Sequence, residues 1–262
     1  MKTLLFTIAT NGYAGLYRVC IQSQKQYATR NGYDYVVVNR PQWILRHSGS
    51  DSAWLKVPLI LGGFNNGYDV VAFIDADCQI LGKCPPLYTL FKASALIYVA
   101  HGFSGRINSG FIVSRNDEGS HRFFSDLLAS AYSYSLPAED IAPYENGYFI
   151  NKGKNSPIVH ILDSCWNNNH VPKSTDFVRH YTGPMRALFE HKLAPRLGVI
   201  AISLISVVLR GILPGKKTFH KRIEAHFRMI LRSFPEYFSD YGIANDLTPD
   251  RMHSPLTSST TR

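Results

Sequence analysis

The sequence predicts an α/β domain, in which a sheet is flanked by helices, followed by a basic, partly apolar helical appendage. Short apolar runs rich in β-branched residues alternate with longer mixed segments, as strands and helices do in such a domain. The 262 residues are 45% hydrophobic, which is enough for one sizeable core. We therefore expect one main domain over residues 1–185, basic amphipathic helices over residues 186–240, and a disordered tail over residues 241–262.

Five apolar runs predict the strands of the sheet. They cover residues 3–9, 34–38, 69–75, 95–100 and 111–114. Between the first two, apolar residues recur at helical spacing from Leu16 to Tyr27, and Asn31 and Gly32 form a stop signal. The first two strands are therefore expected to form a parallel βαβ unit.

The later elements follow the same alternation. Ser50 or Asp51 can cap the approach to a helix that runs through Leu59 and Leu61. Two more helices are expected at residues 117–134 and 138–151, and two late strands at residues 158–162 and 176–181. The alternation ends near Pro184.

The net charge of +9 is concentrated in one segment. Residues 1–185 hold 16 Lys/Arg and 13 Asp/Glu, residues 186–232 hold 10 and 2, and the last thirty residues hold 2 and 4. The positive charge therefore gives little information about the function of the main domain. It bears on what residues 186–232 bind.

The four cysteines show no pattern of a metal site or a disulfide framework. Cys20, Cys78, Cys84 and Cys165 are separated by 58, 6 and 81 residues, with no CxxC pair. We expect reduced, packed thiols in a cytoplasmic protein. The first apolar run is too short for a signal peptide, so we expect it to form a strand.

The segment VVAFIDADCQI, residues 70–80, carries the clearest chemical pattern. An apolar strand delivers Asp75, Ala76 and Asp77 at its carboxyl end, the edge where open α/β sheets bind ligands. Two carboxylates one residue apart can both bind a hard divalent cation, and a bound diphosphate would complete its shell. The alternative is a solvated turn after a buried strand.

This segment resembles the DxD motif of nucleotide-sugar glycosyltransferases of the A-type fold, in particular the retaining galactosyl- and mannosyltransferase group. The resemblance covers about residues 3–185. It also rests on QYATRNGYDYVVV, WLKVPLI, INSGFIVSRN, PYENGYF, CWNN and RHYTGP, in that order. The resemblance implies a Rossmann-like mixed sheet flanked by helices.

The resemblance also implies a metal site. Asp75 and Asp77 would bind the metal and the sugar diphosphate, and His180 would supply a third ligand. Nitrogen beside carboxylates suits Mn²⁺, with Mg²⁺ as the alternative. A lone histidine is more often a surface or core residue, but the Gly183-Pro184 that follows favours the family assignment.

Donor-binding residues follow from the same resemblance. The nucleotide would lie at the end of the first strand, the phosphates near a lysine and the sugar hydroxyls at an Asn-Ser-Gly run. The residues expected to bind the donor are Thr7, Ala9, Asn11, Lys56, Asp75, Ala76, Asn108, Ser109, Gly110 and Gly183. Packing roles within a strand, a helix face or a β-bulge are the alternatives.

Two further sites are expected around the reacting sugar. In related enzymes a glutamine amide faces the sugar, but here Glu145 is followed by Asn146, whose shorter side chain makes Glu145 or Asp140 competing catalytic candidates. Trp166 and Asn167 could form an acceptor shelf, with a buried indole as the alternative.

The appendage is expected to bind a membrane surface. Residues 197–209 are thirteen uncharged, mostly apolar positions, too few to span a bilayer, which needs about 20. Residues 219–234 combine apolar positions at helical spacing with basic residues on other faces. We expect an anionic membrane as partner and no nucleic acid, since no nucleic-acid-reading motif is present. A buried core helix is the alternative.

Together with the resemblance, these patterns lead us to expect a metal-dependent, retaining glycosyltransferase. It would move a hexose from a nucleotide sugar, preferably a UDP-sugar, to a lipid-linked or oligosaccharide acceptor, at the inner face of the membrane. The sequence contains no Walker loop, no GxGxxG motif and no Ser/His/Asp order, so kinase, dehydrogenase and hydrolase functions lack their characteristic residues. The alternative is a non-catalytic glycan- or membrane-binding protein that retains the fold with a degenerate site.

Overall fold

A computed structural model describes the chain except for residues 43–50, 134, 190–192, 213–217 and 243–262. Its centre is a six-stranded sheet with the order β2-β1-β3-β6-β5-β7. These strands are β1 (Thr3–Ile8), β2 (Asp34–Val38), β3 (Val70–Ile74), β5 (Ile97–His101), β6 (Ile107–Arg115) and β7 (Val159–Leu162). Strand β6 runs antiparallel to both of its neighbours, and the other pairs are parallel, so the sheet is mixed as expected.

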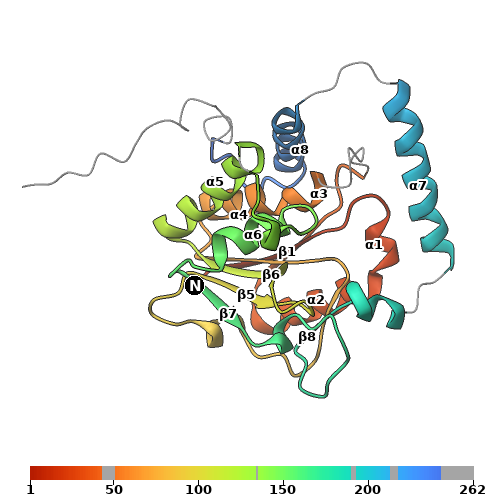
Figure 1. Cartoon of the computed structure of the whole chain (residues 1–262). Helices are drawn as coiled ribbons and strands as arrows, with labels where there is room; N and C mark the ends of the chain where they lie inside the picture. Colours follow the sequence, from red (N-terminus) through yellow and green to blue (C-terminus); the bar gives the residue numbers. More distant parts are fainter. Residues whose placement is uncertain (43–50, 134, 190–192, 213–217, 243–262) are drawn as a thin grey trace, which may run out of the picture.

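Helices cover both faces of the sheet (Figure 1). Alternate residues of a strand point to opposite faces, so Leu4 and Phe6 of β1 pack in one apolar cluster and Leu5 packs in another. Helix α2 (Arg18–Asn31) contributes to the second cluster. The first cluster contains side chains of α4 (Lys56–Asn65), α5 (Glu118–Ser133), α6 (Asn146–Gly153) and α8 (Phe219–Ser233).

The shorter elements complete the fold. They are the helices α1 (Tyr13–Leu16) and α3 (Asp51–Trp54), the 3₁₀ turns at Leu87–Leu90, Ala138–Asp140, Ser164–Trp166 and Gly183–Leu188, and the strands β4 (Cys78–Ile80) and β8 (Val178–His180). The last two strands pair antiparallel in a separate two-stranded sheet. The late strand expected at residues 176–181 therefore forms, but it pairs with β4 and not with the main sheet.

The helix expected at residues 138–151 is wrong in extent. Only a 3₁₀ turn, Ala138–Asp140, and the helix α6, which begins at Asn146, are helical. Pro143 disfavours helical geometry at the residue before it, and Tyr144 takes a left-handed conformation with φ of 59°. The break places Glu145 and Asn146 at the start of α6.

The two helices after residue 185 have different surroundings. Ile223, Phe227 and Ile230 of α8 are fully buried in the same cluster as Leu4 and Phe6 of β1. Because its apolar face is part of the main core, α8 is not an appendage outside the domain of residues 1–185. Part of the expected tail, residues 243–262, lies outside the described residues.

Helix α7 (Leu193–Ile212) lies at the edge of the molecule beside α1 (Figure 1). A Cβ added to Gly12 would lie 3.1 Å from a methyl carbon of Val199 and 3.3 Å from one of Ile202. Other apolar side chains of α7 are 42–64% exposed, namely Leu197, Ile200, Leu204 and Ile205. No helix among the described residues is long and apolar enough to cross a membrane.

All four cysteines lie in the described part of the chain and are free thiols. Cys20, Cys78 and Cys84 are buried and Cys165 is partly exposed. Burial raises the pKa of Cys20 and of Cys84 to about 12 and that of Cys165 to about 11. The expectation of packed, unpaired thiols is confirmed for the three buried cysteines.

Candidate active site

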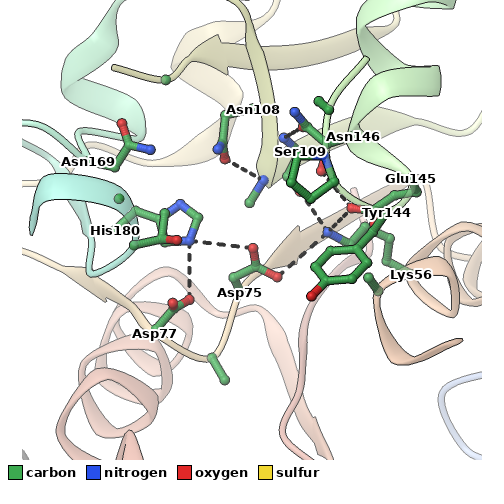
Figure 2. A pocket seen from close by; sticks show the side chains of 18 of the residues that line it. Lys56, Asp75, Asp77, Asn108, Ser109, Tyr144, Glu145, Asn146, Asn169 and His180 are labelled. Atoms are coloured by element: carbon green, nitrogen blue, oxygen red, sulfur yellow. Dashed lines mark hydrogen bonds and ion pairs between the residues drawn. The ribbon is translucent and has the colours of Figure 1, made fainter. Parts of the chain in front are cut away.

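A cavity of about 730 Å³ opens where β1 and β3 end. Its walls come from the loop after β1, the turn after β3, the first residues of β6, α4 and α6, and the segment after β8. Figure 2 shows the polar side chains that converge on it. The sheet edge predicted from the sequence therefore does carry a cavity.

Asp75, Asp77 and His180 meet on one side of this cavity. His180 Nε2 lies 3.2 Å from Asp77 Oδ1 and 3.6 Å from Asp75 Oδ2 (Figure 2). The pairing of β4 with β8 places His180 opposite Cys78, next in the chain to Asp77. His180 is thus brought to the two carboxylates by strand pairing.

The three groups shift one another's pKa values. Burial alone lowers the pKa of His180, but the carboxylates of Asp77 and Asp75 outweigh it and raise that pKa above its usual value. Burial raises the pKa of Asp75, and the nearby Lys56 and His180 offset this only in part. Burial is the largest single influence on Asp77 and raises its pKa, but His180, a backbone hydrogen bond and Arg186 together outweigh it and lower that pKa. Charge coupling of this kind is common at functional sites.

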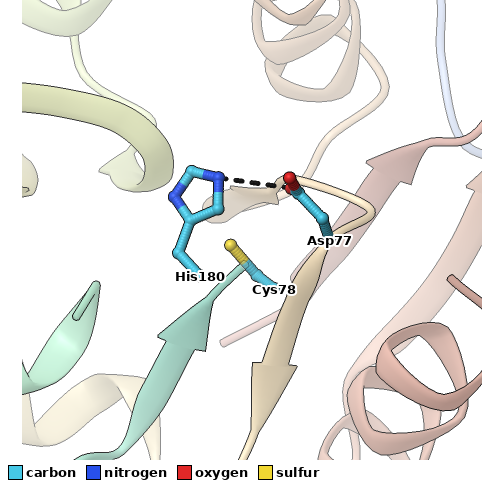
Figure 3. Close-up of side chains that lie close together, drawn as sticks. All are labelled: Asp77, Cys78 and His180. Carbon is cyan, nitrogen blue, oxygen red and sulfur yellow. Dashed lines mark ion pairs between the residues drawn. The ribbon is translucent and has the colours of Figure 1, made fainter. Parts of the chain in front are cut away.

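Cys78 lies beside this group. Ligand atoms of Asp77, Cys78 and His180 are within 4.8 Å of one another, so these three residues could also hold a metal ion (Figure 3). Burial and the charge of Asp77 raise the pKa of Cys78 well above its usual value, and its thiol donates to Gly110 O at 3.7 Å. Carboxylates suit Mn²⁺ and Mg²⁺, whereas thiolates select softer metals, which favours the carboxylates and the imidazole for these two ions.

Lys56 and Glu145 form a buried ion pair on the opposite side of the cavity. Lys56 Nζ lies 2.7 Å from Glu145 Oε1 and 3.6 Å from Asp75 Oδ1, and the side chains of Lys56 and Glu145 are each 3% exposed. Ser109 Oγ donates to the same Glu145 Oε1 at 2.7 Å. Glu145 Oε2 is buried and has no hydrogen-bond partner among the described residues. This oxygen is therefore a buried acceptor without a donor, in a residue that lines the cavity.

The other catalytic candidates have structural partners. Asn146 Oδ1 accepts from the Ser109 N–H at 2.8 Å, and its Nδ2 donates to Ile107 O at 3.2 Å, so the amide is engaged with the β6 backbone. Asp140 is buried, accepts from Asn151 and Lys154, and does not line the cavity.

The expected donor and acceptor residues separate into two groups. Those that line the cavity are Asn11, Lys56, Asp75, Ala76, Asn108, Ser109, Gly110 and Gly183. Thr7 of β1 and Ala9, directly after that strand, are buried and do not line the cavity. Trp166 is 6% exposed and stacks on Phe111, and Asn167 is fully buried. Neither residue lines the cavity.

Sequence reasoning missed several cavity residues. Tyr13, Phe103, Tyr144 and Arg186 line the cavity, and Phe103 and Tyr144 are 58% and 52% exposed. They lie on short helices or connecting segments. These segments are too short for a repeating hydrophobic pattern, so the sequence does not show which of their aromatic side chains are exposed. The left-handed backbone at Tyr144 also leaves no sequence pattern, since the residue is not glycine.

No protein-family model and no curated protein matches the chain. Among solved structures, the chain is similar to a glycosyltransferase involved in glycosylation of the major capsid of PBCV-1, with a TM-score of 0.54 and 11% identity over 71% of this chain and 98% of that chain. It is also similar to the glycosyltransferase GlyE of Streptococcus pneumoniae TIGR4, with a TM-score of 0.48 and 12% identity over 87% of this chain and 64% of that one. A third is the galactosyltransferase LgtC, with a TM-score of 0.46 and 13% identity over 84% and 99%.

The first of these similarities establishes the architecture. A mixed six-stranded sheet flanked by helices matches the predicted fold class, and nearly all of the capsid glycosyltransferase is covered. At 11% identity the similarity concerns the fold alone. The chain has the A-type glycosyltransferase fold.

Proposed function

We propose that the protein is a metal-dependent, retaining glycosyltransferase that moves a hexose from a UDP-sugar to a lipid-linked or oligosaccharide acceptor. The observation that carries this proposal is the cavity itself. Two carboxylates and an imidazole face it from one side and a buried Lys-Glu pair from the other, at the sheet edge where this architecture binds ligands. The glycosyltransferase neighbours support the same reaction class at the level of fold.

The donor set fits a hard divalent cation. His180 Nε2 lies 3.2 Å from a carboxylate oxygen of Asp77 and 3.6 Å from one of Asp75, near the spacing of about 3 Å between neighbouring ligands of an ion with bonds of about 2.1 Å. Asp75, Asp77 and His180 would hold Mn²⁺ or Mg²⁺. When bound, the cation supplies positive charge that stabilises the departing nucleoside diphosphate.

Glu145 is the residue that we assign to the reacting sugar. Its Oε1 is held by Lys56 and Ser109, so the carboxylate cannot rotate freely, and its Oε2 is left to accept a sugar hydroxyl or to stabilise positive charge on the reacting carbon. Asn146 holds the β6 backbone in place beside it. Lys56 also lies near Asp75, which links the two sides of the cavity.

Donor hydrolysis tests this function. With Mn²⁺ the protein should release hexose slowly from a UDP-hexose without loss of the sugar's anomeric configuration, and EDTA should stop the release. Asp77→Ala should abolish metal-dependent UDP binding, and Glu145→Gln should lower turnover by at least about 100-fold with little change in UDP affinity. Asp126→Ala, which removes an exposed carboxylate on α5, is the control.

Two results would refute the proposal. Full turnover by Asp77→Ala with Mn²⁺ would remove the metal assignment. Binding of nucleotide or glycan with no turnover of any UDP- or GDP-hexose would favour the non-catalytic binding protein.

We further propose that α7 holds the enzyme at the cytoplasmic face of an anionic membrane. Four of its apolar side chains are exposed while Val199 and Ile202 face Gly12. Arg196 of α7 is an exposed basic residue, as are Arg186 before this helix and Lys221 of α8. Exposed apolar patches of this kind mark interaction sites, and basic residues favour acidic lipid. Replacing Leu197 and Leu204 by Glu should abolish flotation with phosphatidylglycerol liposomes without lowering hydrolysis of a soluble donor. Unchanged flotation would refute the assignment.

A further inference from the structure

A continuous chain of hydrogen bonds joins the backbone of β6 to His180. The Gly110 N–H donates to Asn108 Oδ1 at 2.9 Å, and Asn167 Nδ2 donates to the same oxygen at 2.8 Å and to Asn108 O at 3.3 Å. Asn167 Oδ1 then lies 3.0 Å from His180 Nδ1. Asn167 is fully buried and His180 is 3% exposed, so water does not compete for these contacts.

The direction of every bond in this chain follows from its first member. A peptide N–H can only donate, so the atom of Asn108 that receives it is the amide oxygen. That oxygen can accept a second bond only from a donor, which must be the NH₂ group of Asn167. The oxygen of Asn167 therefore faces His180, and an oxygen without a proton requires that His180 Nδ1 carries one.

The position of the imidazole ring is set by the same strand. A Cβ at Gly110 would lie 2.3 Å from His180 Cε1 and 2.6 Å from Nδ1, so the ring packs directly against the glycine backbone. Its other nitrogen, Nε2, points toward Asp77 and Asp75 (Figure 2). A histidine binds a metal through a nitrogen lone pair, and the partner of the opposite nitrogen decides which one is available.

We infer that Asn167 is a positioning residue that keeps the proton of His180 on Nδ1, so that Nε2 is the nitrogen offered to the divalent cation. The inference rests on the proposed metal site and gives Asn167 a role in holding a metal ligand, in place of the acceptor contact predicted from the sequence. Asn108 and Gly110 set the orientation of the Asn167 amide.

Two variants of similar size separate this role from a merely structural one. Asn167→Asp and Asn167→Leu both lose the donations to Asn108, but only aspartate keeps an oxygen that accepts from His180 Nδ1. Calorimetric titration with MnCl₂ alone should show affinity within about threefold of wild type for Asn167→Asp and a loss of about 10- to 100-fold for Asn167→Leu. Equal affinities of the two variants, whether both high or both low, would overturn the inference.

A second measurement does not depend on the stability of either variant. Two-bond ¹H–¹⁵N spectra of the metal-free wild-type protein, labelled in histidine and assigned with His180→Gln, should show a proton on Nδ1 of His180. A His180 with its Nδ1 unprotonated would overturn the inference even if Mn²⁺ binds. Failure of the wild-type protein to bind Mn²⁺ would instead refute the metal site of the proposed function, so the two failures are distinguishable.

Discussion

Phe227→Ala tests whether α8 belongs to the core of the catalytic domain. The Phe227 ring is fully buried, lies against Gly62 of α4, and contacts the ring of Tyr241 with a centroid separation of 5.4 Å. Truncation of a buried phenylalanine costs about 3–5 kcal/mol, because apolar burial is lost and a cavity remains. For a protein of this size the cost corresponds to a fall in Tm of about 6–20 °C.

The assay is urea and thermal unfolding followed by circular dichroism. Leu204→Ala is the matched control, since this α7 side chain is 64% exposed and its truncation should change the free energy of unfolding by no more than about 0.5 kcal/mol. A Phe227→Ala variant within about 1 kcal/mol of the Leu204→Ala variant would show that α8 does not contribute to the core. For the same reason we expect a chain ended at residue 185 to aggregate, since it would expose the surface that α8 covers.

Three further predictions concern the site and its surroundings. Gly110→Ala should weaken Mn²⁺ binding by at least about tenfold in a calorimetric titration, because the added Cβ would displace the His180 ring, and unchanged affinity would contradict the packing described above. Lys56→Met should cost about 3–5 kcal/mol in urea unfolding, because it leaves the buried Glu145 carboxylate without its partner, and adding Glu145→Gln should recover part of that loss. Hydrogen bonds from Asn151 and Lys154 lower the pKa of Asp140. A lowered pKa contributes stability above the unfolded value of about 3.9 that is lost at lower pH, so Asp140→Asn should be less stable than wild type at pH 7 and the difference should shrink below about pH 4. A difference that stays constant with pH would refute this account.

Local sequence patterns determined most of the main sheet. Six predicted strands correspond to β1, β2, β3, β5, β6 and β7, since apolar β-branched runs bounded by turn residues carry their own signal. The same is true of the Asp75–Asp77 motif, because its place at the end of a strand depends only on the residues next to it.

The partners of that motif depended on contacts between distant parts of the chain. His180 reaches Asp77 through the pairing of β4 with β8, and Lys56 reaches Glu145 only because α4 and α6 begin on the same side of the cavity. The family resemblance suggested each of these residues, but the sequence does not show how far apart they lie in the folded chain. The choice of Glu145 over Asn146 likewise rests on which side-chain atoms the fold leaves without a partner.

The two helices after residue 185 show the same division. The sequence by itself determined that both segments form helices with apolar positions, because helical periodicity is a local property. Whether an apolar face meets a protein core or remains exposed is decided by the surface that lies opposite it. Only the tertiary structure could place the apolar face of α8 in the main core and leave Leu197, Ile200, Leu204 and Ile205 of α7 exposed, since the free energy of burying an apolar side chain depends on its surroundings and not on its neighbours in sequence.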